Sequence, residues 1–314
     1  MGEQANKIGK KLDGFGEKLF SGFGWNEIAR DTEIQCSRKY QHNKQTHGLD
    51  LLMNFNNPYM RCNQGIVVEC KNRQMRSINQ AELDKWLEEL INAIECAQSA
   101  PELQDFDMGN TMLNTGLLLI HANDSFNSEL FNKYLCNLKV HSRRNPINVF
   151  IAGNDEIDRW NSLRNKIEKD FTSEFQFIYP SIEGSNMELG NYLTINQLYS
   201  KYIFAQDMKY IEKTEAGTSY KVPQVRKIMI SFDEISKGNF KYMWSMFKAL
   251  QFQDAKELVF VFYPRKNSDV EFVKDNFINT LYQIQQPITE NIASRIKLEF
   301  IDNRSLSPVD MGGR

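Results

Sequence analysis

Short apolar runs alternate with amphipathic segments along most of this chain, and this alternation constrains the fold more than any other feature. Between residues 116 and 180 the order is GLLLIHA, SELFNKYLCNLK, INVFIAG, DEIDRWNSLRNKIEKD and FQFIYP. The same rhythm returns between residues 227 and 300 as KIMISFD, FKYMWSMFKAL, ELVFVFYP, VEFVKDNFINTLYQ and IKLEF. Strands separated by helical patterns are typical of α/β folds with parallel strand pairs. We therefore expect two α/β units.

The length and composition of the chain agree with a prediction of two α/β units. A chain of 314 residues with 41% hydrophobic residues is long enough for two domains with real cores. We expect an N-terminal domain over 1–180, a linker over the less regular stretch 181–224, and a C-terminal α/β domain over 225–314. No apolar stretch approaches 18 residues and the N-terminus lacks the apolar core of a signal peptide, so we expect no membrane span and a cytoplasmic protein.

The first hundred residues predict a helix, three strands and a second helix. Apolar residues at helical spacing predict a helix over residues 5 to 20, which Gly14 and Gly16 should weaken. Alternating or apolar text predicts strands over 25–40, 49–55 and 66–71, the last two joined by the polar segment NNPYMRCNQG. Ser77 and Gln80 have capping-box spacing before a long apolar stripe, which predicts the second helix.

Charged residues interrupt the second and third of these strands. Period-two alternation places Glu69 and Lys71 on one face at the end of an apolar strand. Asp50 lies between Leu49 and Leu51 on the preceding strand, and a hairpin centred near position 60 would pair it with Glu69 or Cys70. Two carboxylates and a lysine would then converge, as metal-dependent phosphodiester hydrolysis requires.

This arrangement resembles the PD-(D/E)XK nuclease superfamily, whose restriction-endonuclease-like core has the order αβββαβ. The match consists of Asp50 and the element Glu69-Cys70-Lys71, and Gly48-Leu49 replaces the usual proline as in the Mrr-type and nuclease-related-domain branches. The resemblance implies that Asp50, Glu69 and the Cys70 carbonyl bind Mg²⁺ or Mn²⁺, with Lys71 as the catalytic cation. We thus expect an α/β fold with this core, an α/β extension and a second C-terminal α/β unit.

Members of those branches often add a metal-binding glutamate from the first helix. Glu17, in GFGEKLF, has a similar Gly-Glu context and is our choice, with Glu27 and Glu33 as alternatives. Two other stretches, residues 207–209 and 254–256, also match the D-x-K pattern. Only residues 69–71 end an apolar strand that is followed by a capped amphipathic helix.

Local charge supports a nucleic-acid substrate. Residues 36–78 hold seven basic and two acidic residues, whereas residues 79–110 hold eight acids and one lysine. A basic patch near the site would attract a phosphate backbone. The expected contacts are Arg38, Lys39, Lys44, Arg61, Arg73 and Arg76. Two auxiliary candidates are His47, otherwise a solvated loop residue, and Gln80, otherwise a helix cap.

The five cysteines are scattered and never form CxxC. The sequence therefore indicates neither a disulfide framework nor a thiolate zinc site, and buried reduced thiols are expected.

The functional prediction is a cytoplasmic Mg²⁺-dependent nuclease that cuts DNA, with RNA as a further possibility. By analogy with the superfamily, we expect it to act in prokaryotic restriction or anti-phage defence, with a partner protein or as a homo-oligomer. The alternatives are a catalytically inactive nucleic-acid-binding or scaffold subunit of the same fold, and a surface salt bridge without function.

Overall fold

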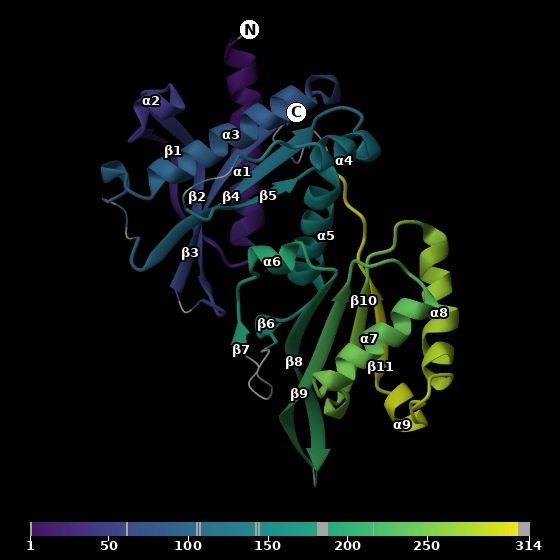
Figure 1. Ribbon diagram of the computed structural model, residues 1–314. Coiled ribbons are helices and arrows are strands. Elements are labelled where there is room, and N and C mark those ends of the chain that lie inside the picture. The colour runs from purple at the N-terminus through teal and green to yellow at the C-terminus, as the bar shows by residue number, and fades with distance from the viewer. Residues whose placement is uncertain are drawn as a thin grey trace. The chain divides into compact units, whose positions relative to one another are not determined.

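The computed structural model describes residues 2–60, 62–104, 106, 108–141, 143, 145–180, 188–215 and 217–306, with the backbone alone for residues 2–11. These residues form two compact units, shown in Figure 1. The first unit comprises the residues up to Asn161 and those from Ser305 onward, and the second unit comprises Ser162 to Arg304. The predicted α/β class with two units is confirmed.

The first unit has one mixed sheet in the order β1-β2-β3-β4-β5. Its elements are α1 (Gly2–Ser21), β1 (Asn26–Gln35), α2 (Lys39–His42), β2 (Thr46–Asn57), β3 (Cys62–Arg73), η1 (Met75–Ser77), α3 (Gln80–Ala97), η2 (Pro101–Leu103), β4 (Thr111–Ala122), α4 (Ser128–Cys136), β5 (Asn148–Ala152) and α5 (Asn154–Asp170), which continues into the second unit. The first three strands are antiparallel, and β3, β4 and β5 run parallel. This is the predicted αβββαβ order.

Helices α1 and α3 cover opposite faces of this sheet (Figure 1). Leu118 and Ile120 of β4 belong to the core beneath α3, together with Leu90. Leu119, which alternation turns to the other face, lies 3.6 Å from the Cβ that a residue larger than glycine would carry at Gly16 of α1. Helix α1 is continuous through its glycines, and Gly16 lets it approach the sheet closely.

Strands β2 and β3 form the predicted hairpin. Their ladder runs from Asn57 with Cys62 to Leu51 with Val68, so its register brings Asp50 next to Glu69. The strands are longer than predicted because polar side chains pair inside the sheet. Gln64, for example, is buried and bonded to neighbouring strands on both sides.

The expected capping box at the start of α3 is wrong. Ser77 lies in η1, and Asn79 is the N-cap, because its side chain accepts a hydrogen bond from the backbone N–H of Glu82 at 3.2 Å. Since asparagine is as good a cap as serine, the helix itself forms as predicted.

The second unit has a mixed sheet in the order β11-β10-β9-β8-β6-β7. Its elements are β6 (Gln176–Tyr179), β7 (Glu188–Gly190), α6 (Ile195–Leu198), β8 (Tyr202–Glu215), β9 (Thr218–Ser231), α7 (Lys237–Ala249), η3 (Phe252–Asp254), β10 (Glu257–Phe262), α8 (Asn267–Tyr282), α9 (Glu290–Ala293) and β11 (Ile296–Phe300). Strands β9, β10 and β11 are parallel, and α7 and α8 pack on an aromatic core.

The domain boundaries differ from the expected ones. Strand β6, expected in the first domain, pairs with β7 and β8 of the second sheet. The expected linker contains β7, α6, β8 and part of β9, while residues 181–187 lie outside the described residues. Alternating apolar runs predict that strands exist but do not specify which sheet each one joins. None of the described helices is long and apolar enough to cross a membrane.

Candidate active site

Acidic side chains gather where β2 and β3 separate. Beyond Leu51 and Val68, the Asp50 carboxylate accepts the backbone N–H of Cys70 at 2.7 Å. Asp13 of α1 is 7% exposed and takes a hydrogen bond from the Cys70 thiol. Carboxylate atoms of Asp13 and Asp50 and the Cys70 sulfur all lie within 4.8 Å of one another. The sheet end thus brings an acid from α1 against the predicted acid of β2.

Glu69 and Lys71 form an ion pair beside this cluster. Their side chains are 13% and 15% exposed, and the Lys71 ammonium donates to the Glu69 carboxylate. By alternation they lie on the face of β3 opposite to the Cys70 side chain. Asp50 lies between the two groups, because its charge acts on the pKa of Asp13 and on that of Glu69.

Burial and mutual repulsion raise the pKa values of these carboxyl groups. Burial, followed by repulsion from Asp50, raises the pKa of Asp13 to about 6. Burial and repulsion from Asp50 likewise raise the pKa of Glu69 to about 7, against the opposing effect of Lys71. Burial also raises the pKa of Asp50, although the Cys70 N–H and Lys71 oppose it. Crowded carboxylates with raised pKa values are a donor set that a hard divalent cation fits, because its charge relieves both causes.

Lys71 remains a cation in this environment. Burial alone would lower its pKa, but the Glu69 and Asp50 carboxylates outweigh burial and hold the pKa above its usual value. An ammonium with a raised pKa is suited to hydrogen bonding and charge stabilisation rather than to acting as a base.

The structure places Glu17, the expected α1 ligand, away from this cluster. Its carboxylate pairs with Arg30 of β1 at 3.2 Å. The two alternatives are also engaged elsewhere, Glu27 with Arg30 and Glu33 with the Thr46 hydroxyl. Asp13, one helical turn before Glu17, is the α1 acid that lies within 4.8 Å of Asp50 and Cys70, and the sequence analysis did not name it.

The auxiliary candidates also lie elsewhere. His47 is 4% exposed and its Nε2 contacts His42 Nδ1 at 3.3 Å, so it belongs to a different cluster. The Gln80 amide donates to Asp84 of its own helix at 3.3 Å. Of the two competing D-x-K matches, Asp207 is fully buried in an ion pair with Arg226, which is a structural contact.

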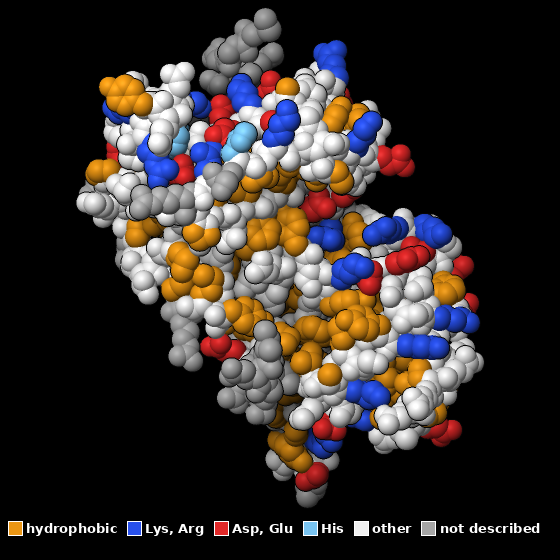
Figure 2. Space-filling model, in the orientation of Figure 1, with side chains coloured by type: hydrophobic (Ala, Val, Ile, Leu, Met, Phe, Trp, Pro, Cys, Tyr) orange, Lys and Arg blue, Asp and Glu red, His pale blue; other side chains and the backbone are white. Residues whose placement is uncertain are grey.

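The expected basic patch is partly neutralised by the acidic helix α3. Arg38 pairs with Glu95 at 3.0 Å and Lys44 with Glu89 at 3.0 Å, and Figure 2 shows the two signs intermingled over α2 and α3. The remaining expected contacts are the exposed Lys39, Arg73 and Arg76, for which the described residues provide no acidic partner, and Arg61, which lies outside the described residues.

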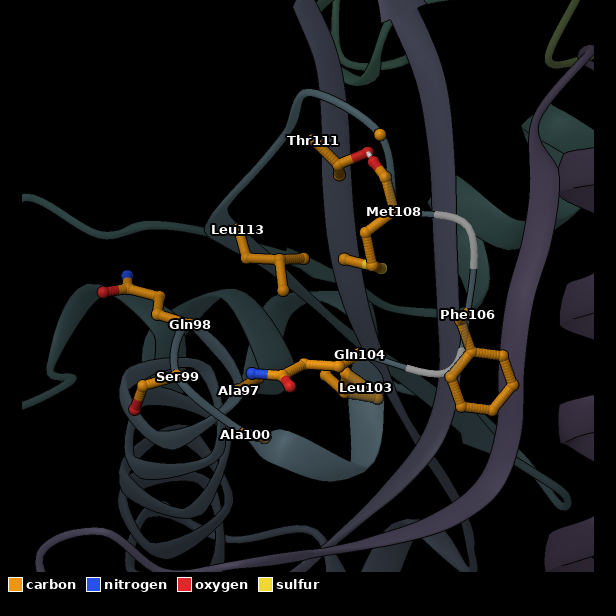
Figure 3. Close-up of a pocket in the computed structure, with 11 residues that line it drawn as sticks. Ala97, Gln98, Ser99, Ala100, Leu103, Gln104, Phe106, Met108, Thr111 and Leu113 are labelled. Carbon is orange, nitrogen blue, oxygen red and sulfur yellow. Dashed lines mark hydrogen bonds between the residues drawn. The ribbon is translucent and has the colours of Figure 1, made fainter.

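Two cavities of the first unit are lined by residues other than those of the acidic site. One of about 450 Å³ opens beyond the C-terminal end of α3, between Leu103, Met108 and Leu113 (Figure 3). Its described lining residues carry no charge, which does not suit a phosphate group or a metal ion.

A mixed sheet between two helices, with carboxylates and a lysine at the end of its central hairpin, defines a nuclease domain of the restriction-endonuclease-like class. Residues 1–156 match the family model described as the PD-(D/E)XK nuclease domain of GAPS4 protein. The chain thus belongs, through its first unit, to the PD-(D/E)XK nuclease superfamily, whose members generally use divalent metal ions. No curated protein matches the chain.

Proposed function

We propose that the first unit hydrolyses phosphodiester bonds of DNA with Mg²⁺ or Mn²⁺ held by Asp13, Asp50 and Glu69. The observation that carries this proposal is the position of Asp50 at the end of the β2–β3 hairpin, where its charge acts on Asp13, on Glu69 and on Lys71. The Cys70 carbonyl is a further candidate ligand by resemblance to the superfamily. When bound, the divalent ion would lower the pKa of a water molecule and neutralise charge on the scissile phosphate.

The protein's own groups would position this chemistry. The Cys70 N–H fixes one oxygen of Asp50, which leaves its other oxygen available. Glu69, whose pKa is about 7 without a cation, orients the Lys71 ammonium. In this orientation the Lys71 ammonium would donate a hydrogen bond to the attacking water or to the phosphate oxygens and stabilise the negative charge that develops on them.

The substrate proposal rests on charge near the site. Lys39, Arg73 and Arg76 are exposed; Arg73 ends β3, the strand that carries Glu69 and Lys71, and Arg76 lies in η1 just after it. Contacts of this kind would hold a phosphate backbone in a salt-dependent manner without reading its sequence.

We further propose that the enzyme serves prokaryotic restriction or anti-phage defence in the cytoplasm, together with a partner protein or as a homo-oligomer. An intracellular nuclease without a sequence-reading element needs restraint, and a gating partner would provide it. This step rests on analogy with the superfamily.

Cleavage assays test the catalytic proposal. The purified full chain is incubated with plasmid, linear DNA, single-stranded DNA and RNA in Mg²⁺, Mn²⁺ or EDTA, alone and with the product of a neighbouring gene. We expect metal-dependent cleavage of DNA that Glu69→Gln and Lys71→Met each reduce by at least about 100-fold.

The matched control is the exposed D-x-K decoy, changed as Asp254→Asn with Lys256→Met. We expect this control to cleave like the wild type. Cleavage that persists in the Glu69→Gln, Lys71→Met double variant would exclude the assigned site. Wild-type protein that binds DNA but never cuts it, with or without its partner, would instead establish the inactive binding subunit.

A further inference from the structure

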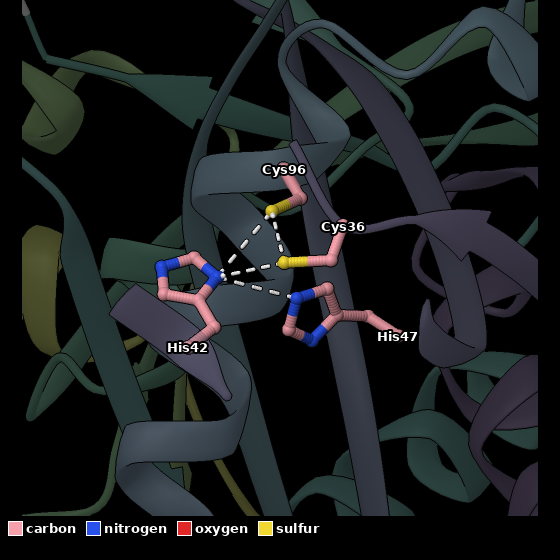
Figure 4. A group of neighbouring side chains, drawn as sticks. All are labelled: Cys36, His42, His47 and Cys96. Atoms are coloured by element: carbon pink, nitrogen blue, oxygen red, sulfur yellow. Dashed lines mark hydrogen bonds between the residues drawn. The ribbon is translucent and has the colours of Figure 1, made fainter. Parts of the chain in front are cut away.

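Four buried metal-binding side chains meet on the α3 side of the first unit, away from the carboxylates. Cys36 follows β1, His42 ends α2, His47 lies in β2 and Cys96 lies near the end of α3. Cys36, His47 and Cys96 are 2%, 4% and 0% exposed, and the His42 side chain is 2% exposed. Figure 4 shows the two sulfurs and the ring nitrogens pointing toward one another. Sulfur and imidazole donors are the ligands that Zn²⁺ prefers.

The spacing of these donor atoms is that of a tetrahedral zinc site. With Zn–S bonds of about 2.3 Å and Zn–N bonds of about 2.0–2.1 Å, tetrahedral edges are about 3.8 Å between sulfurs, about 3.5 Å between sulfur and nitrogen, and about 3.3 Å between nitrogens. The Cys36 and Cys96 sulfurs are 3.8 Å apart. His42 Nδ1 lies 3.3 Å and 3.5 Å from them, and 3.3 Å from His47 Nε2. His47 lies within 4.8 Å of the other three ligand atoms.

Hydrogen bonds within this cluster leave the Nδ1 atom of His42 shared among several neighbours. The Nε2 atom of His42 faces the Glu95 carboxylate at 3.2 Å, and with the hydrogen on Nε2 the Nδ1 atom has one lone pair. That single lone pair faces three neighbours at 3.3–3.5 Å, namely Cys36, Cys96 and His47. A cation at the centre would accept a lone pair from each of the four atoms at once.

The surroundings also suit a metal. A histidine ligand usually donates its second ring N–H to a carboxylate, and Glu95 fills this place for His42. Glu95 is itself held by Arg38 at 3.0 Å. Two cysteine thiolates would balance the charge of Zn²⁺, which makes the burial of the whole group tolerable.

We propose that Cys36, His42, His47 and Cys96 bind one structural Zn²⁺ ion. Four protein ligands leave no open position, so the ion would stabilise the fold rather than take part in hydrolysis. Cys36, His42 and His47 lie within a span of twelve residues that covers the β1–β2 connection and the start of β2. Cys96 lies on α3. Helix α2 within this connection buries no apolar residue, so the ion would add to the contacts of Arg38 and His42 with Glu95 that tie it to α3. The same ion would anchor the start of β2, the strand that carries Asp50.

Metal analysis tests the proposal on the full chain purified without chelators. We expect one zinc ion per wild-type chain and loss of that ion in Cys36→Ser and Cys96→Ser. The matched control, Cys136→Ser, changes an exposed cysteine and should retain zinc. An Asp13→Asn, Asp50→Asn double variant should also retain it, which separates this site from the carboxylates.

Cobalt substitution makes the test independent of whether the serine variants fold. Zinc-stripped wild type reloaded with Co²⁺ should show the intense visible bands of tetrahedral cobalt together with thiolate-to-cobalt charge transfer. Wild type that retains no stoichiometric zinc and gives no such spectrum would overturn the proposal. So would a Cys36–Cys96 disulfide in the native protein, or loss of the zinc in the double carboxylate variant.

Discussion

Replacing Asp13 by asparagine should make the metal-free protein more stable at neutral and alkaline pH. The folded protein buries the Asp13 carboxylate near Asp50, and its pKa rises from 3.8 to about 6. A raised pKa means that folding penalises the ionised form of this acid. Asparagine has nearly the same shape and no charge to bury.

The size and sign follow from linkage. A shift from 3.8 to about 6 corresponds to about 3 kcal/mol, at 1.36 kcal/mol per pKa unit, by which the ionised Asp13 destabilises the fold above pH 6. Below pH 4 the acid is protonated in both states and the penalty vanishes. Asparagine weakens the hydrogen bond from the Cys70 thiol, which costs about 1 kcal/mol. We therefore expect Asp13→Asn to raise the free energy of unfolding by about 2 kcal/mol at pH 8 and to give no such gain at pH 4.

Urea unfolding in EDTA, followed by tryptophan fluorescence, measures this difference. Only Trp244 of the four tryptophans lies in the second unit, so a Trp244→Phe background makes the signal report on the first unit. Glu129→Gln, an exposed change on α4, is the control and should stay within about 0.5 kcal/mol of the wild type at every pH.

In the presence of magnesium we expect Asp13→Asn to have the opposite effect on stability, which provides a second check of the reasoning. A cation that binds the folded site stabilises the wild type by mass action, and Asp13→Asn should lose part of that gain. The reasoning is refuted if Asp13→Asn is less stable than the wild type at pH 8 in EDTA, or if its effect is the same at pH 4 and pH 8.

Three further predictions address packing, the buried ion pair and nucleic-acid contacts. Gly116→Ala would place a Cβ 2.6 Å from a side-chain carbon of α3, and we expect thermal unfolding to show a loss of about 1–3 kcal/mol. Arg226→Ala leaves the fully buried Asp207 carboxylate without its partner, and we expect a loss of about 3–5 kcal/mol in the second unit, measured by its tryptophan fluorescence. Arg73→Ala and Arg76→Ala should each weaken DNA binding and reduce the slope of log affinity against log salt by about 1, measured by fluorescence anisotropy. Unchanged melting curves or salt slopes would contradict the respective prediction.

The sequence predicted the hairpin that places Asp50 next to Glu69. Asp50, Glu69 and Lys71 lie on two strands joined by a short turn, so alternation and hairpin register are sufficient to bring them together. The ladder from Asn57–Cys62 to Leu51–Val68 has the predicted register.

The first-helix acid could not be chosen in this way. Asp13 and Glu17 are one turn apart on α1, and either side chain satisfies the local pattern. Which of them meets Asp50 depends on how far α1 slides along the sheet. That position depends on tertiary packing, such as the close approach of Gly16 to Leu51 and Leu119, which no local sequence pattern encodes.

The sequence analysis missed the cluster of Cys36, His42, His47 and Cys96 for a related reason. The chemistry of its donor atoms also explains how two metal sites would coexist in one domain. Three of its members lie within twelve residues, but Cys96 follows 60 residues after Cys36 on another element, so no spacing rule applies. Its soft sulfur and imidazole donors favour Zn²⁺, whereas the oxygen donors of Asp13, Asp50 and Glu69 favour Mg²⁺ or Mn²⁺. The two sites would therefore sort their ions by ligand chemistry. A chelator specific for zinc should then loosen the β1–β2 connection while leaving the carboxylates able to bind magnesium.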